Sequence, residues 1–209
     1  MYFHKTPWLL KVLYPQLVWD KYNDEKKLYL TFDDGPVPQV TSLVLDILDK
    51  YHAKASFFCV GENIRRNPGL FREIHAAGHS VGNHTFNHLN GWKTPDNLYL
   101  ENINKCEKLI SEILPNRSTK LIRPPYGRIT RSQIKMLIDH FRIIMWDYLV
   151  GDFDKNLDPK WGLDHARKKT KDGSIIIFHD SLKAEKNLRF MLPVYLKYFV
   201  DMGYQFKAL

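Results

Sequence analysis

Two adjacent carboxylates stand where a short, largely apolar run of this chain ends. Asp33 and Asp34 follow residues 28–32 and precede Gly35-Pro36. The run is typical of a buried strand, and Gly-Pro is typical of the turn that ends it. Neighbouring carboxylates repel each other unless a cation or an arginine neutralises one of them. Aspartate and glycine are also ordinary turn residues, so these residues alone leave a solvated turn as the alternative.

His84 and His88 are separated by three residues, a spacing that metal sites use. On one helical turn, or in a tight loop of similar reach, both imidazoles can bind one metal ion. A carboxylate from Asp33 or Asp34 would complete a set of two histidines and one carboxylate, which leaves positions open for water and substrate. Because the same ligand types suit the Fe(II) of an oxygenase, this pair alone leaves both hydrolysis and oxidation open.

Three more polar groups follow apolar runs in the same way. Arg123 stands before two prolines, Asp147 and Asp152 follow a run that ends at residue 146, and His179 directly follows a run over 174–178. Acid–base chemistry needs a proton acceptor, a proton donor and charges that orient them. These residue types can supply all three, provided that the fold brings them together.

Strand-like and helix-like stretches alternate along the chain. The predicted strands cover residues 27–32, 55–60, 80–83, 120–123, 142–146, 174–178 and 204–207. The predicted helices cover residues 41–51, 68–76, 96–114, 130–140, 159–171 and 188–201. Residues 84–94 and 147–158 are predicted to be loops.

This alternation predicts a single α/β domain, a barrel of about seven parallel strands that is closed or nearly closed. An open, doubly wound sheet is the alternative. No glycine-rich dinucleotide fingerprint follows the first strand, which counts against a Rossmann cofactor domain. The carboxyl ends of barrel strands open on one face, where active sites are built. We therefore expect the five polar groups to lie together.

Composition narrows the class of protein. The net charge of +8 favours anionic partners, but no nucleic-acid-binding motif accompanies the dispersed lysines and arginines, so no nucleic-acid partner is expected. Cys59 and Cys106 have no metal-type spacing and are typical of buried free thiols. No run of about 20 apolar residues is present, so no membrane-spanning helix is expected.

Residues 1–26 precede the first predicted strand. Lys11 interrupts their apolar run and no small-residue cleavage site follows, so the segment is a poor signal peptide and we expect a cytoplasmic or membrane-peripheral protein. An extension packed on the domain is favoured. A weak interfacial helix in contact with a membrane surface stays open.

Four motifs together resemble the polysaccharide deacetylases, the NodB-homology family also called carbohydrate esterase family 4. Residues 31–36 resemble its TFDDGP motif, residues 84–88 its HTxxH motif, residues 123–126 its RPPY motif and residues 176–180 its apolar-apolar-HD motif. Their order and spacing fit this family over residues 27–209, whereas residues 1–26 lie outside the resemblance. The family fold is a distorted (β/α) barrel, in line with the predicted elements.

The resemblance implies hydrolysis of an N-acetyl group on an amino sugar. Asp34, His84 and His88 would bind one divalent metal, with zinc favoured and cobalt, nickel, manganese and iron left open. Asp33 would be the general base and Arg123 would pair with it.

The same resemblance assigns the remaining roles. The backbone N–H of Tyr126 would stabilise the oxyanion, and His179 would protonate the leaving amine while Asp152 orients its imidazole. Trp146, Ile177 and Phe153 would line the pocket for the acetyl methyl. Trp92, Trp161 and Tyr148 are either sugar-stacking aromatics or ordinary core and surface residues, and the second interpretation is favoured.

One motif departs from the family. Its DxxDW pattern aligns with residues 149–153, where Leu149 replaces the first aspartate and Phe153 replaces the tryptophan. Phenylalanine lacks the indole N–H, so the substrate groove is expected to differ. Whether Asp147 or Asp154 stands in for the missing carboxylate is left open.

Three other functions stay open. One is an amidohydrolase of the same fold that acts on a small non-sugar amide, another is a non-catalytic glycan-binding module, and the third is the oxygenase named above. The favoured partner is an N-acetylated glycan, of peptidoglycan, chitooligosaccharide or precursor type. The sequence leaves the natural substrate and the oligomeric state undetermined.

Overall fold

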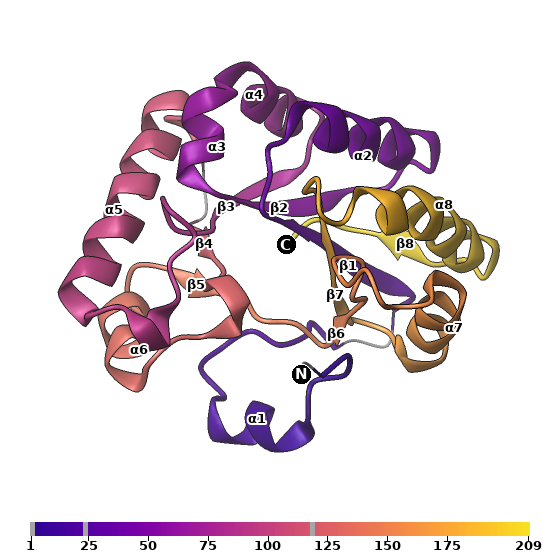
Figure 1. Ribbon diagram of the computed structural model, residues 1–209. Coiled ribbons are helices and arrows are strands. Elements are labelled where there is room, and N and C mark those ends of the chain that lie inside the picture. Colours follow the sequence, from indigo (N-terminus) through magenta and orange to yellow (C-terminus); the bar gives the residue numbers. More distant parts are fainter. Residues whose placement is uncertain (1–2, 23–24, 118–119) are drawn as a thin grey trace.

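Eight parallel strands form the sheet in the part of the chain that the computed structural model describes, residues 3–22, 25–117 and 120–209 (Figure 1). Seven of them lie in the order β5-β4-β3-β2-β1-β7-β6, and β8 also pairs with β1. The distorted (β/α) barrel of about seven parallel strands predicted from the sequence is confirmed. The strands are β1 (Lys27–Asp33), β2 (Ala55–Cys59), β3 (Ser80–Asn83), β4 (Leu121–Ile122), β5 (Arg142–Ile143), β6 (Tyr148–Leu149), β7 (Ile175–His179) and β8 (Gln205–Phe206).

Helices surround this sheet on its outer side (Figure 1). Six of them agree with the predicted helices except at their ends; α2 begins at Pro38, because proline is favoured in a first turn, and α8 begins at Glu185. The helix α3 is not predicted from the sequence. The helices are α1 (Trp8–Leu13), α2 (Pro38–Lys50), α3 (Gly61–Arg66), α4 (Pro68–Ala76), α5 (Asp96–Ile113), α6 (Arg131–Leu137), α7 (Pro159–Lys169) and α8 (Glu185–Asp201), with 3-10 turns η1 (Gly91–Lys93) and η2 (Pro125–Gly127).

The prediction of a loop over residues 147–158 is wrong in one part, because these residues include the strand β6. Leu149 pairs with Ile177 of β7, and the Val150 N–H donates to the Ile177 carbonyl over 3.1 Å. A strand of two residues shows no apolar alternation that a sequence pattern could reveal. β4 and β5 are equally short, so the strands predicted over 120–123 and 142–146 end earlier than expected.

The N-terminal segment, defined here as residues 3–22, lies across the two edges of the sheet. β5 and β6 are those edges. Val18 forms a parallel bridge to Ile144, just after β5, and Lys5 forms an antiparallel bridge to Tyr148 in β6. The segment thus satisfies backbone groups at both edges, which would otherwise be unpaired. Residues 1–2 and 23–24 of the predicted extension lie outside the described residues.

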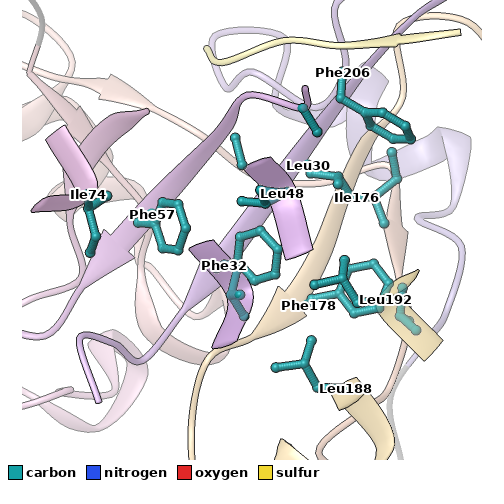
Figure 2. Close-up of a cluster of buried hydrophobic side chains, with 14 of the residues drawn as sticks. Leu30, Phe32, Leu48, Phe57, Ile74, Ile176, Phe178, Leu188, Leu192 and Phe206 are labelled. Atoms are coloured by element: carbon teal, nitrogen blue, oxygen red, sulfur yellow. The ribbon is translucent and has the colours of Figure 1, made fainter. Parts of the chain in front are cut away.

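The side chains of β1 alternate between two environments. Leu28, Leu30 and Phe32 pack in the large core cluster with residues of α2, α8 and neighbouring strands. Figure 2 shows Leu30 and Phe32 in this cluster. The residues between them face the opposite side of the sheet, because successive strand side chains alternate. Thr31 and Asp33 therefore point into the barrel interior, where both contact the same arginine.

The structure tests the expectations for the two cysteines and for a membrane-spanning helix. Cys59 and Cys106 are buried and free, as predicted. Within the described ranges, every helix is too short or too polar to cross a membrane.

Candidate active site

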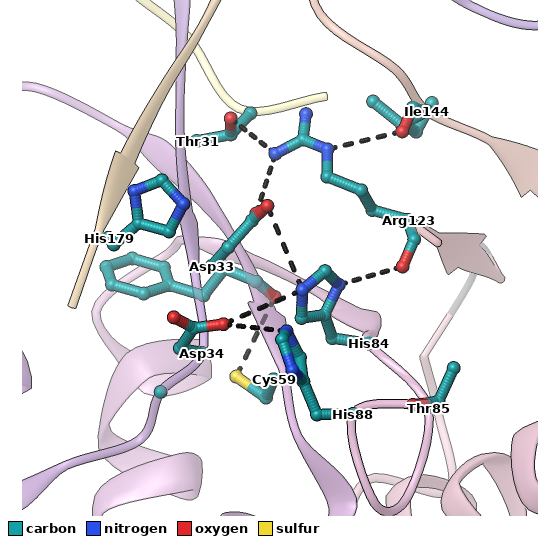
Figure 3. Close-up of polar contacts among 12 residues, drawn as sticks. Thr31, Asp33, Asp34, Cys59, His84, Thr85, His88, Arg123, Ile144 and His179 are labelled. Atoms are coloured by element: carbon teal, nitrogen blue, oxygen red, sulfur yellow. Dashed lines mark hydrogen bonds and ion pairs between the residues drawn. The ribbon is translucent and has the colours of Figure 1, made fainter. Parts of the chain in front are cut away.

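A buried ion pair lies beneath the carboxyl end of β1. Arg123, which follows β4, places Nη1 2.7 Å from Oδ1 of Asp33 (Figure 3). The same Nη1 donates to Thr31 Oγ1 over 2.7 Å, and Nε and Nη2 donate to the carbonyls of Ile144 and Met145. The arginine is 0% exposed. Because Thr31 and two backbone carbonyls fix the guanidinium, its hydrogen bond holds the Asp33 carboxylate in one orientation.

Burial lowers the pKa of the Arg123 guanidinium, and the negative charge of Asp33 opposes that shift. An arginine nevertheless stays protonated over any ordinary pH, because its pKa starts far above that range. The ring of Phe58 lies 4.2 Å from its Cζ and adds a cation–π contact. Arg123 is therefore a permanent buried cation beside Asp33.

Three potential metal ligands converge just above this pair. Oxygen or nitrogen atoms of Asp34, His84 and His88 all lie within 4.8 Å of one another. His88 Nε2 is 3.1 Å and His84 Nε2 is 3.8 Å from Asp34 Oδ1 (Figure 3). The structure therefore brings together the three residues that the sequence predicts as a metal site.

His84 has the tautomer and the charge that a metal ligand needs. Its Nδ1 lies 2.8 Å from the Arg123 carbonyl, and this acceptor fixes the proton on Nδ1. Nε2 then carries a lone pair and faces Asp34. Burial lowers the pKa of His84 to about 4, so the ring is neutral at physiological pH.

Asp34 occupies a left-handed backbone conformation, with φ of 84°. Burial acts to raise the pKa of its carboxyl, but the hydrogen bond to His88 and the nearby imidazoles outweigh it and hold the pKa below its usual range. Asp180 supports the turn beyond it, accepting hydrogen bonds from the Gly35 N–H and from Thr41 Oγ1. A Cβ at Gly35 would lie 1.9 Å from Asp180 Oδ2, so only glycine fits.

Two asparagines position the histidine loop, and sequence reasoning missed both. Asn83 Oδ1 accepts from the Thr85 N–H, and Asn102 Oδ1 of α5 accepts from the N–H groups of Phe86 and Asn87. Thr85 and His88 have positive φ, of 60° and 56°. These side chains fix a loop that no helix or strand holds, and nothing in the sequence alone separates them from ordinary polar residues.

His179 and Asp152 form a second pair on the other side of the site. His179 Nδ1 lies 2.8 Å from Asp152 Oδ1, and its backbone N–H donates to Asp152 Oδ2 over 2.7 Å. Burial acts to lower the pKa of the imidazole, but the charge and hydrogen bond of Asp152, with smaller contributions from Asp34 and Asp33, raise it to about 9. His179 is therefore protonated at neutral pH.

One cavity of about 790 Å³ connects these groups. It is lined by Asp33, Asp34, His84, His88 and His179, and also by Tyr126, Trp146, Leu149, Phe153 and Ile177. Arg123 and Asp152 lie behind this surface, each 0% exposed. All eleven residues predicted for the site are therefore in the cavity wall or in direct contact with a residue of the wall.

Two consecutive residues of the turn at Tyr126 have left-handed backbone conformations. Tyr126 and Gly127 have φ of 61° and 65°. A Cβ at Gly127 would lie 2.4 Å from the Trp146 ring. Glycine is therefore required there, both for its backbone and for the close approach of the indole.

The structure places the other candidate residues from the sequence in different surroundings. Trp92 lines the cavity. Trp161 stacks on His165, and Tyr148 is buried with its hydroxyl 2.7 Å from His165 Nδ1. Asp147 is buried between Lys5 and Lys11 of the N-terminal segment, so it does not replace the carboxylate missing at Leu149.

The comparisons with known proteins identify the family. The family model for polysaccharide deacetylases matches residues 20–140. A peptidoglycan-N-acetylglucosamine deacetylase of Bacillus cereus is 33% identical over 196 residues, which cover 91% of this chain and 89% of the relative. The peptidoglycan-N-acetylmuramic acid deacetylase PdaC of Bacillus subtilis is also 33% identical, but this chain spans only 38% of its length. The chain belongs to the polysaccharide deacetylase family.

Solved structures show the same fold. The Bc1960 peptidoglycan N-acetylglucosamine deacetylase, in complex with 4-naphthalen-1-yl-N-oxidanyl-benzamide, has a TM-score of 0.89 and 28% identity and covers 98% of this chain and 95% of its own. A carbohydrate esterase family 4 pseudoenzyme of Bacillus anthracis has a TM-score of 0.80, covering 91% of this chain and 66% of its own, but its identity of 22% makes it evidence of fold alone. The fold therefore does not guarantee activity, and function rests on the site.

Proposed function

We propose that this chain is a metal-dependent hydrolase that removes the N-acetyl group from an amino sugar of a glycan. One observation carries the proposal: three potential metal ligands, a buried Asp–Arg pair and a protonated His–Asp pair surround a single cavity. The relatives named above act on peptidoglycan, which supports an N-acetylglucosamine-type substrate. Chitooligosaccharides and precursor glycans are substrates of the same chemical class.

Asp34, His84 and His88 would hold the metal. Two imidazoles and one carboxylate suit zinc, and such a set leaves a position open for water or substrate. His84 meets the requirement that a ligand be deprotonated, because it is neutral and its Nε2 is free of a proton. When bound, the metal would polarise the acetyl carbonyl and lower the pKa of a water.

Asp33 would act as the general base. It lies at the edge of the ligand set, with Oδ2 3.9 Å from His84 Nε2, and would take the proton of the attacking water. Arg123 would orient the carboxylate through Oδ1 and leave Oδ2 for that proton. The Tyr126 N–H would stabilise the negative charge that develops on the acetyl oxygen.

His179 would act as the general acid. Its Nδ1 proton is held by Asp152, so Nε2 is the atom that donates a proton to the leaving nitrogen. Because its pKa is raised to about 9, the imidazole is charged and ready to donate at neutral pH. Trp146, Ile177 and Phe153 would surround the acetyl methyl.

Acetate release tests this proposal. The purified protein is incubated with N-acetylglucosamine oligomers and with peptidoglycan fragments, as isolated, after chelation, and after zinc is restored. We expect release that chelation abolishes and zinc restores, and that Asp33→Asn removes. Activity equal in wild type and Asp33→Asn would indicate that the site is not catalytic.

A further inference from the structure

The active-site cavity has a second wall with a different chemical character. Besides the polar groups of the site, it is lined by a set of apolar side chains that we call the apolar wall: Phe3, Leu10, Leu17, Ile129, Ile134 and Met145. Tyr14, Thr6, Trp19 and Trp92 also line the cavity, and the last three already donate their side-chain hydrogens to backbone carbonyls. Three residues of the apolar wall belong to the N-terminal segment, nearly all of which precedes residues 20–140, the part of the chain that matches the family model. No catalytic role described above uses them.

This wall is poorly suited to a second sugar ring. Each sugar hydroxyl that loses water needs a hydrogen-bond partner, and an unpaired one costs binding energy. The six side chains of the apolar wall carry no donor or acceptor. Leu149 and Phe153 reduce the polarity of the cavity further, because they stand where the family has a carboxylate and an indole N–H.

An ion-pair cluster holds the N-terminal segment in place beside the cavity. Asp147, 4% exposed, contacts Lys5 Nζ through Oδ2 and lies 2.6 Å from Lys11 Nζ through Oδ1. Lys11 is in α1, in which no residue is buried. Ser174 Oγ donates to the same carboxylate over 2.6 Å. The fold thus uses a buried carboxylate to keep an apolar helix at the cavity.

Two cations line the same cavity. The guanidinium of Arg128 lies 5.2 Å from the Trp92 ring, and Lys183 Nζ lies 5.1 Å from the Phe153 ring. In the described part of the chain, neither forms an ion pair with a carboxylate within 4.0 Å. Cations and an apolar wall in one cavity complement a ligand that joins a phosphate to an apolar chain.

The exterior next to the cavity is also apolar. Phe3 is 67% and Leu10 is 37% exposed, although both line the cavity. Trp8, Leu9, Val12 and Leu13 of α1 are exposed as well. An apolar chain bound at the wall would therefore continue onto an apolar surface rather than into water.

From these observations we infer that the apolar wall binds the lipid chain of a lipid-linked amino sugar, whose N-acetyl group reaches the site of Asp33 and His179. The inference rests on the proposed function and specifies its substrate class. It assigns the N-terminal segment to substrate binding.

Two simple glycosides test it. The octyl and methyl glycosides of N-acetylglucosamine differ only in the alkyl chain, and acetate release is measured below the critical micelle concentration. Each methylene that becomes fully buried is worth about fourfold in affinity. We expect kcat/KM to be at least tenfold higher for the octyl glycoside. Equal values, or a preference for N-acetylglucosamine oligomers over the octyl glycoside, would overturn the inference in favour of a glycan subsite.

A substitution in the apolar wall tests whether the wall causes the preference for the octyl glycoside. Leu10→Ser should reduce the octyl-to-methyl ratio toward one. The matched control is Leu98→Ser, an exposed leucine of α5 that does not line the cavity, and it should leave the ratio unchanged. A ratio that is high but insensitive to Leu10→Ser would overturn the assignment of the wall.

A binding measurement separates this inference from the proposed function. Octyl glucoside has no N-acetyl group, so its binding does not depend on catalysis. We expect calorimetric titration to detect octyl glucoside but not methyl glucoside, with weaker binding to Leu10→Ser. Absence of binding overturns the inference even if deacetylation is found, whereas binding without deacetylation supports the wall and contradicts the proposed reaction.

Discussion

Arg123 Nη1 lies 2.7 Å from Asp33 Oδ1, and both side chains are buried beneath the potential metal ligands. The pair joins the end of β1 to the residue that follows β4 and fixes one oxygen of the proposed base. Its two partners are coupled energetically, because either charge without the other would be buried and unpaired. The proposed catalysis and the stability of the fold therefore depend on the same contact.

Removing the arginine should destabilise the protein strongly. Arg123→Met leaves the Asp33 carboxylate buried and unpaired, and we expect the free energy of unfolding to fall by about 3–5 kcal/mol. Urea denaturation measures the change. Arg123→Met/Asp33→Asn should recover part of the loss, because the charge is gone, while acetate release stays absent. No recovery in the double variant would contradict a charge-based coupling.

Loss of a proposed metal ligand should remove zinc, whereas loss of a histidine outside the ligand set should not. His88→Ala removes a potential ligand that is only half-buried, so we expect loss of bound zinc with little change in stability. His75→Ala, an exposed histidine of α4 outside the ligand set, is the control. Zinc is quantified per chain after dialysis. Equal zinc content in both variants would contradict the proposed ligand set.

Activity should fall at alkaline pH as His179 loses its proton. Its pKa is raised to about 9, so in the unliganded protein an NMR titration of the imidazole should show a midpoint well above 6.5. Asp152→Asn removes the main charge that raises the pKa. We expect this variant to move both the titration and the alkaline limb of kcat/KM to lower pH. An unmoved limb would exclude His179 as the acid.

The same pair should contribute to stability with a defined pH dependence. The pKa of His179 is higher in the folded protein than the unfolded value of about 6.5. The contribution is therefore complete below about pH 6.5 and is lost as pH rises through about 9. Denaturation at pH 6 and pH 10 should show this loss in wild type and a smaller one in Asp152→Asn. An equal loss in both would contradict the pair as its source.

Alanine substitutions at two glycines should change the stability of the protein in opposite directions. Gly127→Ala adds a Cβ at φ of 65° and 2.4 Å from the Trp146 ring, so we expect lower thermal stability and lower kcat/KM. Gly69→Ala, near the start of α4, meets nothing within 4 Å and should raise stability by up to about 1 kcal/mol. Calorimetry measures both. A neutral Gly127→Ala would show that the turn at Tyr126 can relax.

The sequence by itself determined which side chains gather in the cavity. Asp33 and His179 are the last residues of their strands, and His84 and Arg123 directly follow theirs. Parallel strands in one sheet bring their carboxyl ends to the same face. Sequence patterns suffice for that inference, because the end of a strand is a local feature and the alternation of strands with helices implies a parallel sheet. The roles assigned to these residues stay predictions until the experiments above are done.

Only the tertiary structure decided which distant residues hold and extend the site. Asn102 reaches the histidine loop from α5, and Asp147 is bound to Lys5 and Lys11 rather than placed beside Asp152. The N-terminal segment bridges β5 and β6 and lines the cavity. The contacts of the N-terminal segment join residues more than a hundred positions apart, and that of Asn102 joins a helix to a separate loop. No periodicity or motif in one sequence encodes such contacts.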